Sequence, residues 1–185
     1  VLNEFRKLVK SNHDKDIDFY NLSLDDPRVL REFDKGNTIG CFQFGSHGIR
    51  EFCKRIGVSD FGTIVHVNAL YRPGTLRSGA AESFIFRKRG EERIPDQHPV
   101  IAKITKDTYG IILYQEQVMQ LVYEFAGLDW SVADRIRKII AKSKGGDALK
   151  KFEGQFVDGC AKANEYPDSL ARALWDSLLD FGSYS

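Results

Sequence analysis

The stretch from residue 71 to residue 89 carries the residue types that bind nucleic acids or nucleotides. Basic and aromatic side chains are interleaved along it, namely Tyr71, Arg72, Arg77, Phe84, Phe86, Arg87, Lys88 and Arg89. An arginine fork binds two phosphate oxygens at once, and an aromatic face stacks on an exposed base. A plainer interpretation places both phenylalanines in the core and the three basic residues at a solvated helix end. This stretch alone leaves both interpretations open.

A second concentration of positive charge lies between residues 131 and 151. Seven basic residues stand there against two acidic ones, so the segment carries +5 although the whole chain carries +1. The basic residues are Arg135, Arg137, Lys138, Lys142, Lys144, Lys150 and Lys151. This asymmetry favours an anionic partner on one face of the molecule. A solvated helix surface is the alternative explanation.

Known catalytic motifs are missing from the chain. It contains no glycine-rich phosphate loop, no HExxH sequence and no GxSxG motif. Glu116 is the only carboxylate in the stretch 108–120, whereas a two-metal phosphoryl-transfer site needs a set of them. The four histidines lack metal-ligand spacing. We therefore expect a binding element that has no catalytic residue and no metal site of its own.

Length and composition indicate the class of protein. The 185 residues are 42% hydrophobic and 29% charged, which is ordinary for one globular domain or a close pair. No apolar run approaches the roughly 20 residues of a membrane span, and the N-terminal segment has no signal-peptide core. The cysteines Cys41, Cys53 and Cys160 suit reduced thiols, with a histidine-activated cysteine as the alternative. We expect a cytoplasmic protein without a membrane partner.

Hydrophobic periodicity and capping residues predict a mainly α fold, a multi-helix domain with one or two short β-strands. The strand candidates are Thr38–Phe44, which also fits an extended entry, and Ile111–Tyr114. The expected helices cover about 27–35, 47–56, 59–72, 81–90, 100–109, 115–125, 131–144, 150–164 and 168–178. Their apolar faces, around Phe52, Ile64, Val118, Ile136 and Leu174, are expected to form one core.

Four motifs occur in one order and at close spacing. They are FQFGSHGIREFCKRI (42–56), NALYRPGTLRSG (68–79), FRKRG (86–90) and TYGIILYQEQVMQ (108–120). Together they resemble the fingers region of the C-family bacterial replicative DNA polymerase, the polymerase III alpha subunit. ADRIRKIIAKSK (133–144) and LLDFGSYS (178–185) extend the resemblance over residues 25–185. It implies a lead-in segment over residues 1–24, following the palm, and a fingers domain over 25–185 that is truncated at both ends.

The chain departs from the family pattern at several positions. The family usually has arginine at the position of His47, proline at that of Thr75, and LRRAMGKKK in place of IRKIIAKSK. The usual arginine pair is therefore Arg137 and Lys138 here, and lysine keeps the charge but loses the bidentate fork. These departures suggest a divergent member.

The resemblance implies an activity and a set of partners. In this family the fingers close over the incoming deoxynucleoside triphosphate, and the aspartates that hold Mg²⁺ lie in the palm, outside this chain. The chain alone is then expected to bind no cofactor and to be inactive as a DNA-directed DNA polymerase. The implied partners are primer–template DNA, deoxynucleoside triphosphates, the palm of the same polymerase, and replisome components that other regions contact.

The resemblance also implies roles for single residues. The expected nucleotide-binding residues are Arg72, Tyr114, Gln115, Arg137 and Lys138. The expected phosphate- or DNA-binding residues are Arg77, Arg87, Lys88, Arg89, Lys142 and Lys144. A purely architectural role fits Gln115 and Gln117 equally well, because their amides could hold adjacent loops together. A stand-alone helical nucleic-acid-binding or scaffold domain remains the alternative function.

Overall fold

Helices make up most of the described chain. The computed structural model of the protein describes residues 1–140 and 146–184. The first half contains α1 (Leu2–His13), α2 (Pro27–Asp34), α3 (His47–Ile56), α4 (Phe61–Leu70), α5 (Pro73–Arg77) and α6 (Ala80–Lys88). The second half contains α7 (Pro99–Ile104), the 3₁₀ turn η1 (Lys106–Thr108), α8 (Gln115–Gln120), the π-helical turn η2 (Leu121–Phe125), α9 (Trp130–Ile140), α10 (Gly146–Asn164) and α11 (Asp168–Tyr184). The mainly helical prediction is confirmed.

The prediction of one or two short strands is wrong, because no β-strand occurs in residues 1–140 or 146–184. Thr38–Phe44 instead folds into consecutive turns, and the buried hydroxyl of Thr38 donates to the carbonyl oxygen of Phe44 across 2.6 Å. Ile111–Tyr114 is not paired with another strand. The backbone amides of Leu113 and Tyr114 both donate to the side-chain oxygen of Gln117, so one amide side chain takes the place of a neighbouring strand.

Local capping explains several helix boundaries. Asp26 accepts a hydrogen bond from the backbone of Arg28, and Pro27 occupies the first turn of α2, as the sequence predicts. Asp60 caps α4, where its carboxylate accepts from the amide of Thr63 across 2.7 Å. The Arg72-Pro73-Gly74 turn lies where the expected helix 59–72 ends, and it also begins α5 with Pro73 at its first position.

The buried side chains divide into two clusters, and the expectation of one core is therefore corrected. We call the cluster built by α7–α11 the C-terminal core. Phe125, Ile136, Phe156 and Trp175 are almost wholly buried in it. Helix α10 packs on the end of η2 so closely that a side chain at Gly159 would overlap the Ala126 carbonyl. Burial of each large apolar side chain stabilises the fold by about 1.5–3 kcal/mol.

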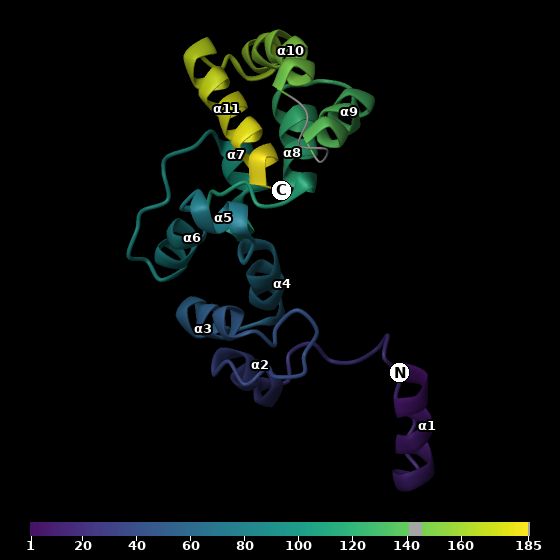
Figure 1. The fold of residues 1–185 in the computed structure, drawn as a ribbon. Helices are drawn as coiled ribbons and strands as arrows, with labels where there is room; N and C mark the ends of the chain where they lie inside the picture. Colours follow the sequence, from purple (N-terminus) through teal and green to yellow (C-terminus); the bar gives the residue numbers. More distant parts are fainter. Residues whose placement is uncertain (141–145, 185) are drawn as a thin grey trace.

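The second cluster, the N-terminal core, joins α2, α3, α4 and α6. Ile56, Val67, Leu70, Phe84 and Ile85 are almost wholly buried in it. Two residues from the extended segment before α8, Ile111 and Leu113, complete this cluster. Figure 1 shows α7–α11 gathered at one end of the body, and α4, α3 and α2 following one another towards the other end. The extended segment therefore ties the two clusters together.

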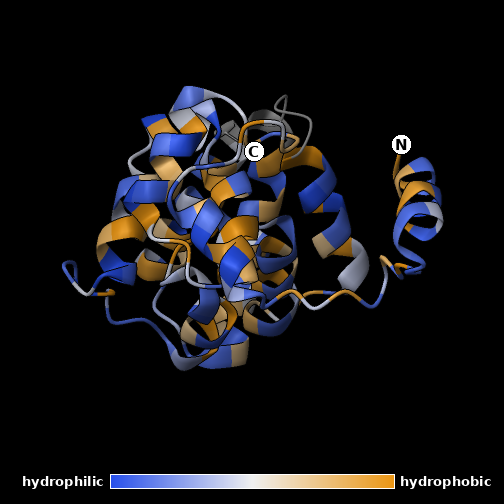
Figure 2. Cartoon of the chain, turned by 90° about the horizontal axis from the view of Figure 1, so that it is seen from below, coloured by the Kyte–Doolittle hydropathy of each residue, from blue (hydrophilic) through white to orange (hydrophobic). Residues whose placement is uncertain are grey.

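Helix α1 stands apart from this body, as Figures 1 and 2 show. None of its residues is buried, and Leu2, Phe5 and Leu8 are all exposed. An exposed ion pair between Arg6 and Asp16 ties the helix to the segment that follows it. Within the described residues, no helix is long and apolar enough to cross a membrane.

Candidate functional site

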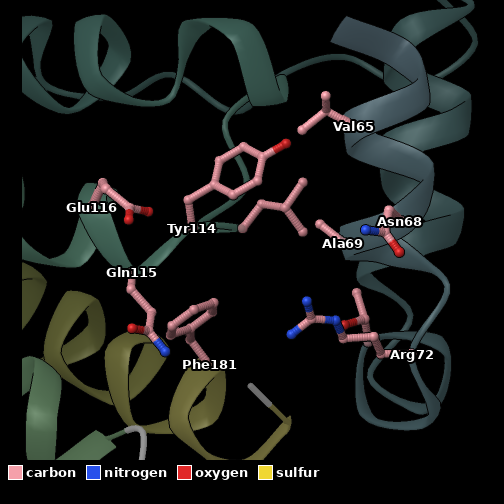
Figure 3. A pocket seen from close by; sticks show the side chains of 10 residues that line it. Val65, Asn68, Ala69, Arg72, Tyr114, Gln115, Glu116 and Phe181 are labelled. Atoms are coloured by element: carbon pink, nitrogen blue, oxygen red, sulfur yellow. The ribbon is translucent and has the colours of Figure 1, made fainter. Parts of the chain in front are cut away.

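A cavity of about 260 Å³ lies where the two clusters meet. We call it the α4–α8 cavity. Helix α4 and the start of α5 form one wall, and the start of α8 together with Phe181 of α11 forms the other (Figure 3). Its lining residues are Val65, Asn68, Ala69, Arg72, Thr75, Leu113, Tyr114, Gln115, Glu116 and Phe181. Leu113 belongs to the N-terminal core and Phe181 to the C-terminal core, so the cavity sits at their junction.

Arg72 brings a positive charge to this cavity. It occupies the N-cap position of α5, where Pro73 restricts the backbone that follows. Its side chain is exposed, and its guanidinium makes no hydrogen bond or ion pair with any residue that the structure describes. In Figure 3, Arg72 and Gln115 approach Phe181 from opposite sides. The guanidinium is therefore available to an anion.

Tyr114 presents its ring to the cavity and directs its hydroxyl away from the basic side chains. The hydroxyl lies 2.6 Å from Nδ1 of His66, and Figure 3 shows it pointing towards α4 beside Val65. Burial raises the pKa of Tyr114 to about 12, with a further contribution from the negative charge of Glu116. Burial also lowers the pKa of His66 below its usual range. Both groups are therefore neutral at neutral pH.

Gln115 connects the cavity to the basic face of α9. Its side-chain oxygen accepts a hydrogen bond from Nη1 of Arg137 across 3.2 Å. Nη2 of Arg137 lies 2.7 Å from Oδ1 of Asp134, and Nζ of Lys138 lies 2.6 Å from Oδ2 of the same carboxylate. These contacts with Lys138 and Arg137 lower the pKa of Asp134. One carboxylate thus holds both cations beside the residue that lines the cavity.

The cavity does not offer the ligands of a two-metal site. Glu116 is the one carboxylate among its described lining residues, and it is exposed. Asp134 already faces two cations. In the part of the chain that the structure describes, no group of three or more His, Cys, Asp and Glu residues is placed to hold a metal ion. The residues present therefore fit an anion better than a Mg²⁺ pair.

Comparison with known proteins identifies the family. A family model described as the bacterial DNA polymerase III alpha subunit finger domain matches residues 1–164. This chain belongs to that family. The match begins at residue 1, so it includes the first 24 residues, which the motifs of the sequence did not cover.

Curated relatives of the finger domain bear the name DNA polymerase III subunit alpha. The protein of Aquifex aeolicus is 39% identical over 180 residues, which is 97% of this chain and 15% of that protein. The proteins of Campylobacter jejuni and Bacillus subtilis are 36% and 34% identical over 184 residues, which is 100% of this chain in each case. The chain spans about 15% of the Campylobacter protein and 16% of the Bacillus protein.

The fold brings together the five residues expected to bind nucleotide. Arg72, Tyr114 and Gln115 line the α4–α8 cavity of the finger domain. Arg137 reaches the cavity through Gln115, and Lys138 is held beside Arg137 by Asp134. Arg72 and Arg137 are 65 positions apart in the sequence, and Gln115 connects them by lining the cavity with Arg72 and bonding to Arg137.

The residues expected to contact DNA phosphates are placed less uniformly. Arg77 is exposed, and its side chain has no partner among the described residues of the finger domain. Arg87 is largely buried, donates to Glu92 across 2.7 Å and donates to the carbonyl oxygen of Tyr109 across 3.1 Å. Lys142 and Lys144 lie outside the described residues.

Lys88 and Arg89 both bind the end of α3. Lys88 donates to the carbonyl oxygen of Gly57 across 2.6 Å, and Arg89 donates to that of Arg55. Positive groups are stabilising at a helix C-terminus, where carbonyl oxygens lack partners. The helix-end interpretation of this run therefore has a structural basis, with the difference that the helix being capped is α3. Contact of these residues with DNA stays a prediction.

The structure distinguishes Gln117 from Gln115. Gln117 is buried, accepts from the amides of Leu113 and Tyr114, and donates to Thr108 and to the carbonyl of Ile104. The architectural alternative therefore describes Gln117. Gln115 faces the cavity and is bonded to Arg137, and its contact with a nucleotide stays a prediction.

Sequence reasoning missed three residues of the site. His66 and Phe181 gave no usable signal, because their contacts lie far away along the chain. Asp134 precedes Arg137 and Lys138 by three and four residues, which is the spacing of ion pairs on one helix face and could have identified it.

Burial raises the pKa of the Cys53 thiol to about 11 and that of Cys160 to about 12, whereas Cys41 is exposed.

Proposed function

We propose that this chain is the fingers portion of a replicative DNA-directed DNA polymerase and that its α4–α8 cavity binds the incoming deoxynucleoside triphosphate. One observation carries the proposal: Arg72, Tyr114 and Gln115 line one cavity, with Arg137 bonded to Gln115. The guanidinium of Arg72, the Arg137 charge beside Gln115 and the aromatic ring of Tyr114 match the two chemical halves of a nucleotide.

The triphosphate binds at Arg72 and at Gln115, to which Arg137 is bonded. The guanidinium of Arg72 has no described partner to displace, so it donates to phosphate oxygens at little cost. Arg137 forms an ion pair with Asp134 and also donates a hydrogen bond to Gln115, so one of its N–H groups points to a residue that lines the cavity. Lys138, which pairs with the same carboxylate of Asp134, places a second positive charge next to Arg137. Preorganised cations of this kind stabilise the charge that develops on a transferring phosphoryl group.

The nucleoside lies against Tyr114. The ring of Tyr114 stands near Val65 and Ala69, on the apolar part of the cavity. Small-molecule pockets commonly have volumes of about 300–1,000 Å³, and this cavity of about 260 Å³ is slightly smaller. The cavity therefore encloses part of the nucleotide, and the remainder extends past its rim.

Primer–template DNA passes beside this cavity. Arg77 contacts a DNA phosphate, because it is exposed and has no described partner. Lys142 and Lys144 contribute further phosphate contacts, and Arg87, Lys88 and Arg89 do so with the donors that their internal bonds leave unused. The chain acts in the cytoplasm. Residues 1–24 form a lead-in from the palm, and residues 25–185 form the fingers domain. Replisome components bind other regions of the longer protein.

Catalysis depends on the palm of the same polymerase, which holds Mg²⁺ outside this chain. Glu116 alone cannot position two metal ions at the cavity. The purified chain should therefore give no extension of a primed template in the presence of Mg²⁺ and deoxynucleotides. Incorporation that persists through repeated purification would contradict this assignment.

Nucleotide titration of charge-deleted variants tests the proposal. Arg72→Ala and Arg137→Ala should each weaken binding of deoxyadenosine triphosphate by roughly 10- to 100-fold, because a bond to a charged group contributes about 1.5–3 kcal/mol. Arg135→Ala is the matched control, since Arg135 is exposed on α9 and does not line the cavity. Equal binding by all three variants and the parent chain would refute the cavity as the nucleotide site.

A further inference from the structure

His66 is bound to the ring that forms the apolar side of the cavity. Its Nδ1 lies 2.6 Å from the hydroxyl of Tyr114, and its ring packs edge-on against Phe84 with centroids 5.2 Å apart. Phe84 is fully buried in the N-terminal core. His66 therefore links the Tyr114 side chain of the cavity wall to a buried part of the fold.

The chemistry of the pair determines the direction of this hydrogen bond. The Tyr114 hydroxyl is part-buried, where a phenol proton without an acceptor is costly. Nδ1 of His66 is the acceptor that the structure provides. We assign Tyr114 as the donor, which corresponds to the neutral His66 tautomer that carries its proton on Nε2.

We infer that His66 is a positioning residue that fixes the Tyr114 ring as the surface against which the nucleoside half of the ligand binds. The inference rests on the proposed function. Because the Tyr114 hydroxyl is held by His66 on the α4 side, the ligand meets the ring and not the hydroxyl. The phosphates lie at Arg72 and Gln115, away from that hydroxyl (Figure 3).

Two probes separate a nucleoside effect from a phosphate effect. Deoxyadenosine triphosphate carries both halves of the ligand, whereas inorganic tripolyphosphate carries only the phosphates. Loss of the hydrogen bond between His66 and Tyr114 should weaken binding of deoxyadenosine triphosphate by roughly 3- to 10-fold, the range of one neutral hydrogen bond. Binding of tripolyphosphate should stay unchanged. Arg72→Ala should weaken both probes.

The variants isolate the hydrogen bond from packing. His66→Phe keeps an aromatic ring against Phe84 and removes the acceptor, while His66→Asn places an amide oxygen near the position of Nδ1 and should restore binding. Tyr114→Phe removes the donor and keeps the ring. The double variant His66→Phe with Tyr114→Phe should bind deoxyadenosine triphosphate no more weakly than either single variant, because all three lack the same bond.

Each outcome decides between the claims. Selective loss of deoxyadenosine triphosphate binding in His66→Phe, with rescue by His66→Asn, supports the positioning role. Unchanged binding in His66→Phe, or equal weakening of both probes, overturns it even if Arg72→Ala behaves as expected. If His66→Phe does not fold, Tyr114→Phe carries the test, and parental binding by that variant overturns the role. No binding of either probe by the parent chain overturns the proposed function itself.

Discussion

Arg137 donates a hydrogen bond from Nη1 to the side-chain oxygen of Gln115 across 3.2 Å, although 22 positions separate the two residues. This bond joins the basic face of α9 to the motif that begins α8. It also brings the charge of Arg137 to a cavity that Arg137 does not itself line. The arrangement makes Gln115 the bridge between two motifs that the sequence shows separately.

The first prediction concerns the shape of the Arg137 side chain. Arg137→Lys keeps the charge but lacks the fork that contacts Gln115 and Asp134 together. We expect this variant to bind deoxyadenosine triphosphate more weakly than the parent and more tightly than Arg137→Ala. Isothermal titration calorimetry measures the three affinities. Parental affinity in Arg137→Lys would show that charge alone matters at this position.

The second prediction separates the two glutamines. Gln117→Leu should lower the free energy of unfolding by roughly 2–4 kcal/mol, because it leaves the buried amides of Leu113 and Tyr114 without their acceptor. Gln115→Leu is the matched control and should lower it by less than about 1 kcal/mol. Urea denaturation followed by circular dichroism measures both values. Similar losses in the two variants would contradict this division of roles.

The third prediction compares two arginines with opposite environments. Arg87→Ala should lower the free energy of unfolding by roughly 1–3 kcal/mol, since Arg87 is largely buried and bonded to Glu92 and Tyr109. Arg77→Ala should leave stability unchanged and weaken binding to a primer–template duplex, most clearly at low salt. Thermal melts and fluorescence anisotropy test the pair. Reversed effects would show that the two roles are assigned the wrong way round.

The fourth prediction concerns acid stability. The pKa of His66 lies below its usual value near 6.5 in the folded chain, because burial disfavours the charged ring. Asp60 and the backbone and charge of Asp107 oppose this shift, and Lys88 adds to it. The unfolded chain therefore binds more protons than the folded chain as pH falls below about 6.5. The stability contribution of His66 is complete above that pH and is lost as pH falls through the folded-state pKa.

The matched variant for this prediction is His66→Asn. Unfolding free energies of the parent and the variant, measured between about pH 5 and pH 7.5, should converge as pH decreases, because the variant has no imidazole to protonate. Parallel pH profiles for the two proteins would mean that His66 titrates alike in the folded and unfolded chains.

The helices were predictable because their signals are local. Asp26 and Pro27 begin α2 through contacts within one turn, and the apolar residues of α9 repeat at helical spacing. A strand was predicted wrongly at Ile111–Tyr114 because this short apolar run resembles a β-strand in sequence. A side chain four residues away, Gln117, satisfies the backbone there, and no local pattern reveals that replacement.

The site was predictable in its parts and not in its arrangement. The motifs identified Arg72, Tyr114 and Gln115, but only the packing of two clusters shows that these residues share a cavity. The bond between His66 and Tyr114 spans 48 positions, so spacing could not predict it. Arg87 was interpreted as an exposed charge because a sequence does not show that Glu92 and the Tyr109 carbonyl surround it.

Chemical-shift mapping of the ¹⁵N-labelled chain during titration with deoxyadenosine triphosphate tests the central claim most directly. The account predicts that the largest changes fall on the backbone amides of Arg72, Tyr114, Gln115 and Glu116, and that they shrink in Arg72→Ala. Changes confined to residues away from the α4–α8 cavity, or no saturable change in the parent chain, would contradict it.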